Sequence, residues 1–353
     1  MRLRRATLFA LAGLAVPVLA GVLLVVSFGA AQTTPARISF QIVTGSTGGT
    51  YFPVGRLIGG LISHAPGVDR CDNTDVCGPP GLIISARTSD GAVSNVLAVN
   101  RGSANSGFAQ ADVVAEAVRG EGAFRKLGKQ THIRVIADLF PEDVHLIVAN
   151  DAKIAAVGDL RGKRVSLGSD SSGTAVTVRA ILAAYGIPVW RMKVRHDGAD
   201  ASAQLLQRGQ LDAFFFVGGR PVRLVDDLIA RHVARLVPIN GAGREELIRS
   251  VSGIAADTIP PGTYRDTPAI ATVSVHALWV VGDREPDALV YGIAKALFHP
   301  HNRAALEGES GSAALIRLDA ATVDLPAPLH SGALRYFREV GRLPKPTARA
   351  GKI

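Results

Sequence analysis

Two successive runs of alternating strand and helix patterns constrain the fold of this chain more than any other feature. The first run opens with an alternating, β-branched segment at 38–43, followed by a glycine-rich polar turn at 44–50. An amphipathic pattern then predicts a helix over 51–64. Further strands of this run are expected at 82–86, 106–109 and 134–138. This alternation predicts an α/β fold.

The second run repeats the same order of elements. It begins at the apolar strand 144–149 and continues with a strand at 164–167, a second glycine-rich turn at 168–174 and a helix over 175–185. A long apolar strand at 272–281 has the length to carry the chain back to the first run. Other elements are expected at 157–160, 201–208, 213–217, 222–230, 234–238, 286–297 and 329–340. We therefore predict two α/β lobes with a ligand cleft between them, joined by two crossover strands.

The two glycine-rich turns are the strongest candidates for a binding site. A helix N-terminus carries free N–H groups and partial positive charge, and glycine lets the backbone approach an anion closely. One such turn alone is more often an ordinary capped helix start, but two matching turns favour a shared ligand. We expect the ligand to be a carboxylate or a similar anion. The candidate ligand-binding residues are Thr44, Gly45, Ser46, Gly48, Gly49, Thr50, Tyr51, Gln110, Ser169, Ser172, Gly173, Thr174, Gly218 and Gly219.

The first 31 residues have the pattern of an export signal. A basic start, Met1–Arg5, precedes an apolar run over 6–31, and Gly29 and Ala31 fit the −3 and −1 positions of a cleavage site before Gln32. The run is also long enough to span a bilayer, so a retained anchor is the alternative. Either outcome places the body of the protein in the periplasm. The expected divisions are 1–31 (signal peptide or anchor), 32–143 (lobe 1), 144–272 (lobe 2) and 273–353 (return to lobe 1 and C-terminal helices).

The only two cysteines lie in a loop rich in turn-forming residues. Cys71 and Cys77 are separated by five residues and followed by Gly78-Pro-Pro-Gly81. Two cysteines this close in an exported protein indicate a disulfide bond. A metal site would need further ligands, and the loop contains no histidine.

Composition and missing motifs exclude several other classes. Aromatic residues make up 5% of the chain, too few for a surface that stacks sugars or bases. The net charge of +9 is spread along the sequence, so we expect no nucleic-acid partner. Ser46 and Ser171 lie outside a Gly-x-Ser-x-Gly elbow, and no His-Glu-x-x-His or P-loop lysine pattern is present. We therefore expect no catalytic residue, no metal and no cofactor.

Six motifs in a fixed order resemble one protein family. They read VTGSTGGTY, DGAVSN, FAQAD, GSDSSGT, LDAFF with GRP, and PLHSGALRYFREVG, and they begin at residues 43, 90, 108, 168, 211 and 328. Together they resemble the TAXI family, the substrate-binding proteins of TRAP transporters, over nearly all of 38–343. The Gly91-Ala92 pair and the Cys71–Cys77 segment depart from the family pattern.

The resemblance implies a type II-like periplasmic-binding-protein fold and a receptor that passes its solute to an ion-driven TRAP permease. Relatives in that family bind small organic acids or amino acids such as glutamate. Two other functions remain open from the sequence. One is a membrane-anchored ligand sensor that retains the leader, and the other is an enzyme that reuses the two-lobed fold.

Overall fold

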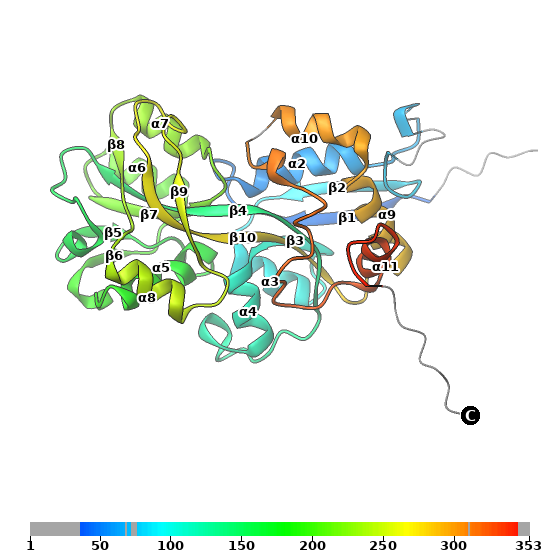
Figure 1. The fold of residues 1–353 in the computed structure, drawn as a ribbon, viewed down its shortest axis with the longest axis horizontal. Coiled ribbons are helices and arrows are strands. Elements are labelled where there is room, and N and C mark those ends of the chain that lie inside the picture. The colour runs from blue at the N-terminus through cyan, green and yellow to red at the C-terminus, as the bar shows by residue number, and fades with distance from the viewer. Residues whose placement is uncertain (1–35, 68, 72–75, 310, 345–353) are drawn as a thin grey trace, which may run out of the picture. The chain divides into compact units, whose positions relative to one another are not determined.

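The predicted alternation of strands and helices is present in the computed structural model of the chain (Figure 1). The structure describes residues 36–67, 69–71, 76–309 and 311–344. The export signal predicted at 1–31 lies outside these residues. The described part of the chain from Arg37 onward forms one compact unit. Within it, no helix combines the length and the apolar character needed to cross a membrane.

The described strands form a single ten-stranded sheet with two similar halves. Its main path runs β2-β1-β3-β10-β4-β7-β5-β6, with β8 beside β4 and β9 beside β10. The strands are β1 (Ile38–Val43), β2 (Leu82–Arg87), β3 (Ser106–Gln110), β4 (Ile133–Ala149), β5 (Arg164–Ser166), β6 (Lys193–Arg195), β7 (Ala213–Gly218), β8 (Ala234–Val237), β9 (Ala255–Ile259) and β10 (Ile270–Gly282).

Each half of the sheet has three parallel strands and one antiparallel neighbour. Strand β1 lies parallel to β2 and β3, and β5 lies parallel to β6 and β7. Parallel neighbours need crossover connections, which here contain helices. The α-helices are α2 (Tyr51–Ile62), α3 (Ala92–Asn100), α4 (Ala111–Arg119), α5 (Gly173–Ala184), α6 (Ala199–Gln207), α7 (Arg223–Ala230), α8 (Ala242–Ser250), α9 (Asp287–Leu297), α10 (Arg303–Glu309) and α11 (Ser331–Glu339).

The long strands β4 and β10 lie side by side and run through both halves (Figure 1). The core that surrounds them changes along their length. On β4, Phe140 belongs to a cluster with Phe40 and Trp279, whereas Val144 belongs to a separate cluster of the second half. We call the half around Phe40 lobe 1 and the half around Val144 lobe 2. The chain thus has the predicted two-lobed architecture with two crossover strands.

The prediction of separate strands at 134–138 and 144–149 is wrong, because both belong to β4. The polar, proline-containing segment between them has the pattern of a break. In the structure Pro141 stays in the ladder opposite His276, beside an irregularity in the register of β10. The buried Glu142 and Asp143 that follow are accommodated by hydrogen bonds from Tyr51 and Arg220. The sequence analysis also missed β6, α8, β9 and α10, which are short or strongly polar.

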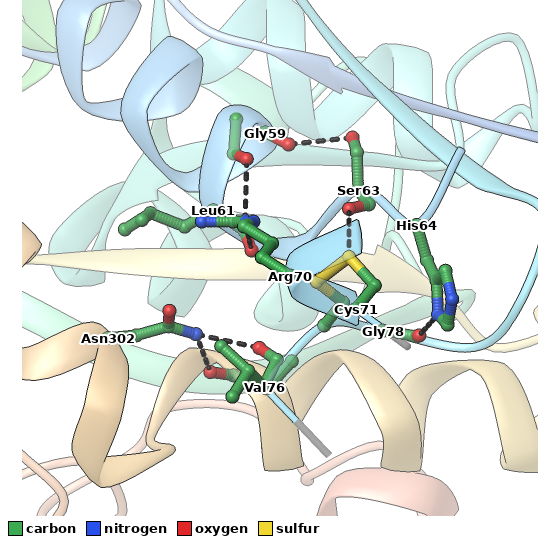
Figure 2. The surroundings of a disulfide bond; sticks show 12 residues. Gly59, Leu61, Ser63, His64, Arg70, Cys71, Val76, Gly78 and Asn302 are labelled. Atoms are coloured by element: carbon green, nitrogen blue, oxygen red, sulfur yellow. Dashed lines mark hydrogen bonds between the residues drawn. A yellow bond between two sulfur atoms is a disulfide. The ribbon is translucent and has the colours of Figure 1, made fainter. Parts of the chain in front are cut away.

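The predicted disulfide is present between Cys71 and Cys77, whose Cα atoms are 5.4 Å apart. Figure 2 shows that the bond lies between the end of α2 and the segment that follows α9. Asn302 donates a hydrogen bond of 2.8 Å to the carbonyl oxygen of Val76, next to the second cysteine. Both cysteines are buried, and the disulfide closes a short loop that the hydrogen bond from Asn302 connects to the rest of lobe 1.

Candidate ligand-binding site

A cavity of about 250 Å³ lies where the strands of both lobes end and their helices begin. This is the edge of an open α/β sheet at which ligands ordinarily bind. Residues of lobe 1 and lobe 2 both line it. They are Gly45, Ser46, Gly49, Thr50, Tyr51, Ser89, Asp90, Gly91, Ala92, Gln110, Glu142, Gly168, Ser169, Ser172, Gly173, Thr174, Gly198, Ala199, Asp200, Ala201, Phe215, Phe216 and Val217.

Five helices begin at this cavity, three from lobe 1 and two from lobe 2. Their N-cap residues, all part of the lining, are Thr50 (α2), Gly91 (α3), Gln110 (α4), Ser172 (α5) and Gly198 (α6). Only in α5 does a side chain cap the helix, since Ser172 Oγ accepts a hydrogen bond from the N–H of Ala175 at 3.1 Å. The first turns of the other four have no side-chain cap at the N-cap position. Because helix N-termini attract negative charge, the cavity is suited to an anion.

The charged side chains of the cavity wall are all acidic. Among the described residues, none of those that line it is Lys, Arg or His, whereas Asp90, Glu142 and Asp200 do line it. Asp90 is exposed and Asp200 belongs to the first turn of α6, where the helix N-terminus stabilises a carboxylate. No group of three or more His, Cys, Asp or Glu side chains suited to a metal ion occurs within the described ranges.

Hydrogen bonds join the two lobes around the cavity. The hydroxyl of Ser169 donates to the carbonyl oxygen of Asp90 at 3.1 Å. Thr177 on α5 donates to Asp112 Oδ2 on α4 at 2.7 Å, and both side chains are buried. Thr50 donates to the carbonyl oxygen of the residue that follows β7 at 3.1 Å. The structure therefore shows the two lobes in contact beside the cavity.

Ten of the fourteen predicted ligand-binding residues line the cavity. They are Gly45, Ser46, Gly49, Thr50, Tyr51, Gln110, Ser169, Ser172, Gly173 and Thr174. Their contact with a ligand stays a prediction.

The other four, Thr44, Gly48, Gly218 and Gly219, are not part of the lining. Thr44 is fully buried and donates its hydroxyl hydrogen to the carbonyl oxygen of Arg87 at 2.6 Å, one layer behind the cavity. Gly48 lies against Asp200, and a Cβ on Gly219 would overlap the side chain of Ser312. The absence of a side chain at Gly48 and Gly219 leaves room for Asp200 and Ser312, respectively.

The acids Asp90, Glu142 and Asp200 line the cavity but are not among the residues predicted to bind the ligand. Glu142 lies in the segment between the two predicted strands, and Asp200 comes two residues after the single Gly198 rather than in a glycine-rich turn. The predicted buried strand at 213–217 is confirmed as β7, and two of its three phenylalanines, Phe215 and Phe216, line the cavity. The feature of the sequence that could have indicated Glu142 is the acidic pair Glu142-Asp143, which interrupts a long apolar stretch.

Several acids behind the cavity have raised pKa values. Burial raises the pKa of Glu142 well above its ordinary value; the hydrogen bond from Tyr51 opposes this rise, and the negative charges of neighbouring acids add to it. Burial raises the pKa of Asp112 to about 6, and that of Asp143 to about 7 although Arg220 contacts it at 2.6 Å. His145, also buried on β4, has its pKa lowered to about 4 by the same loss of solvation. Burial thus disfavours the charged forms of these groups, so that Asp112 and Asp143 take up protons at a higher pH than ordinary aspartates.

Two solved structures of low sequence identity share this architecture. MatC of Rhodopseudomonas palustris, solved with bound malate, is 15% identical, with 87% of this chain and 98% of that chain covered and a TM-score of 0.51. The periplasmic binding protein BugD is 11% identical over 87% of this chain and 94% of that one, with a TM-score of 0.50. These likenesses establish the two-lobed fold of periplasmic binding proteins.

A family comparison extends over most of the chain. The model of the NMT1-like family matches residues 42–341, a span that contains both lobes and all of the residues that line the cavity. The protein therefore belongs to the NMT1-like family.

Proposed function

We propose that this protein is an extracytoplasmic receptor that captures a small anionic solute for a membrane transporter. The observation that carries the proposal is the meeting of five helix N-termini at one cavity. Each N-terminus contributes about half a positive charge and free N–H donors, so the set substitutes for a basic side chain. A volume of about 250 Å³ suits a ligand the size of a small organic acid or amino acid.

The acids on the wall narrow the choice of ligand. An amino acid would direct its carboxylate to the helix N-termini and its ammonium group to Asp90 or Asp200. A dicarboxylate would use the N-termini of both lobes. Malate bound to MatC, a protein of the same fold, supports the inclusion of hydroxy dicarboxylates among the candidates.

We further propose that the transporter is of the TRAP class, with a permease as partner, and that the receptor is periplasmic. The order of the six motifs, which resembles the TAXI family, supports this assignment. No reaction is part of the proposal, because a receptor of this kind binds its solute and releases it unaltered. Mass spectrometry of the recovered ligand tests this point, and turnover of the ligand would place the protein among enzymes.

A thermal-shift screen of organic acids and amino acids tests the proposed ligand class. A ligand that binds only the folded state must raise its stability, by about 2.7 kcal/mol at a hundredfold excess over Kd. We expect a carboxylate to give the largest shift and neutral analogues of the same size to give none. A preference for a neutral or cationic compound would refute the anion site.

Two substitutions in the glycine-rich turns then locate the site. Ser46→Ala and Thr174→Ala each remove a hydroxyl from the cavity wall. The loss of a hydrogen bond to a charged ligand costs about 1.5–3 kcal/mol, or roughly ten- to a hundredfold in Kd. Ser103→Ala, which removes an exposed hydroxyl in lobe 1, is the matched control. Unchanged affinity in both cavity variants would show that the ligand binds elsewhere.

A further inference from the structure

The Glu142 side chain is an unusual member of the cavity wall. It lies on the crossover strand β4, is 1% exposed and still lines the cavity. Tyr51 at the start of α2 donates its hydroxyl hydrogen to Glu142 Oε2 at 2.7 Å. In the described part of the chain this is the only side chain that hydrogen-bonds to the Glu142 carboxyl, and no cation forms an ion pair with it.

The charges around Glu142 disfavour its ionised form. Asp112 on α4 and both Asp138 and Asp143 on β4 itself act on it with negative charge. The nearby cations belong to other acids, since Arg220 contacts Asp143 at 2.6 Å and His276 contacts Asp138 at 2.7 Å. Directly across the ladder, β10 places the apolar Val275 opposite Glu142. The cavity itself adds the acids Asp90 and Asp200. An ionised Glu142 would therefore be a buried carboxylate without a counter-charge, which is a costly arrangement.

A protonated Glu142 would instead suit the anion that the helix N-termini attract. The Tyr51 hydroxyl donates to Oε2, so the acid proton is free to reside on Oε1. A neutral carboxylic acid that donates to an anionic oxygen forms a short, charge-assisted hydrogen bond. We propose that Glu142 is a specificity-determining residue that is held protonated and donates this proton to the bound anion, which makes ligand capture dependent on pH. This inference rests on the proposed function for its ligand.

The linkage between protonation of Glu142 and ligand binding gives the direction in which Kd changes with pH. If only the protonated receptor binds the anion well, the Kd rises by up to about tenfold per pH unit above the pKa of Glu142. Burial raises that pKa, so the dependence lies above the range of ordinary glutamates. The anion in turn favours the protonated form, so its binding takes up protons at a pH where Glu142 is partly ionised.

The protonation state is measured without any ligand. Carboxyl ¹³C labelling restricted to glutamate leaves Asp112, Asp138 and Asp143 silent, and the Glu142 resonance is identified by its loss in Glu142→Gln. Glu245→Gln, at an exposed position in the first turn of α8, is the matched control. We expect one glutamate resonance to keep its protonated position at pH 6.5 and to disappear only in Glu142→Gln. Titration of every glutamate in the ordinary range would overturn the proposal.

The role in binding is measured with L-malate and L-glutamate as probes. Above the pKa that the titration gives, wild-type Kd should rise with pH, whereas Glu142→Gln, which keeps an N–H donor, should lack this contribution. Any pH dependence that remains in the variant belongs to Asp112 or Asp143, so the difference between the two profiles isolates Glu142. Identical profiles would overturn the donor role. Failure of both probes to bind the wild type would count against the proposed ligand class, while the titration still decides the protonation state.

Discussion

Replacement of Asp112 by asparagine should change how the stability of this protein depends on pH. Asp112 is 5% exposed at the start of α4, and its Oδ2 atom accepts a hydrogen bond from Thr177 of the other lobe. Burial raises its pKa from 3.8 to about 6. Between these values the folded protein holds a proton that the unfolded chain releases. The free energy of unfolding therefore falls as pH rises through this window.

The size of this change in unfolding free energy follows from the pKa shift of Asp112. A rise of about 2 pKa units corresponds to about 3 kcal/mol, since one unit is about 1.4 kcal/mol. Asparagine has nearly the same shape and no charge. Its amide group can donate to the Thr177 hydroxyl, which can turn its own hydrogen to the carbonyl oxygen of Gly173 at 3.2 Å. The variant should therefore not share the loss of stability that wild type shows as pH rises, and it leaves no buried polar group at residue 112 without a hydrogen bond.

Urea unfolding of both proteins from pH 4 to pH 7 measures this difference. We expect the unfolding free energy of Asp112→Asn, relative to wild type, to rise by about 2.4 kcal/mol across that range, because part of the full change lies below pH 4. Coincident transitions by circular dichroism and fluorescence establish that one transition is followed. Asp227→Asn, at an exposed position of α7, should show no such change. A difference between Asp112→Asn and wild type that stays constant or falls with pH would refute the reasoning.

Three further outcomes are expected. A double Cys71→Ser, Cys77→Ser variant should lose at most about 2 kcal/mol of stability, and two reactive thiols in the unreduced wild type would contradict the disulfide. Intact-mass measurement of the exported protein should give a chain that begins near Gln32, whereas a retained leader would indicate an anchor. Gly173→Ala should weaken ligand binding about tenfold, because its Cβ would displace the Gln110 side chain from its place in the cavity wall and remove a hydrogen-bonding group from the ligand. Gly60→Ala, on an exposed face of α2 with nothing within 4 Å, should leave binding unchanged and raise stability by up to about 1 kcal/mol.

Local sequence patterns were sufficient to predict most of the helices and strands and ten of the residues that line the cavity. Period-two and period-3.6 patterns predict β1, α2 and α9, because the buried faces of these elements are spaced regularly, and a continuous apolar run predicts the buried strand β7. The turns at 44–50 and 168–174 could be recognised because a helix start that admits an anion needs small residues with free N–H groups. The disulfide also followed from sequence, since two cysteines so close together in an exported chain seldom stay reduced.

Tertiary structure decided which side chains reach the cavity. Thr44 belongs to the same turn as Ser46, yet its hydroxyl is directed to Arg87 and away from the cavity. Glu142 lies nearly a hundred residues from the first turn, and only the path of β4 between the lobes brings it to the cavity beside Tyr51. Its protonation depends on burial and on neighbouring acids, which are properties of the folded arrangement. Local propensity fixes where a helix begins, but the convergence of five helix starts on one cavity depends on how the parallel strands of both lobes are ordered in the sheet.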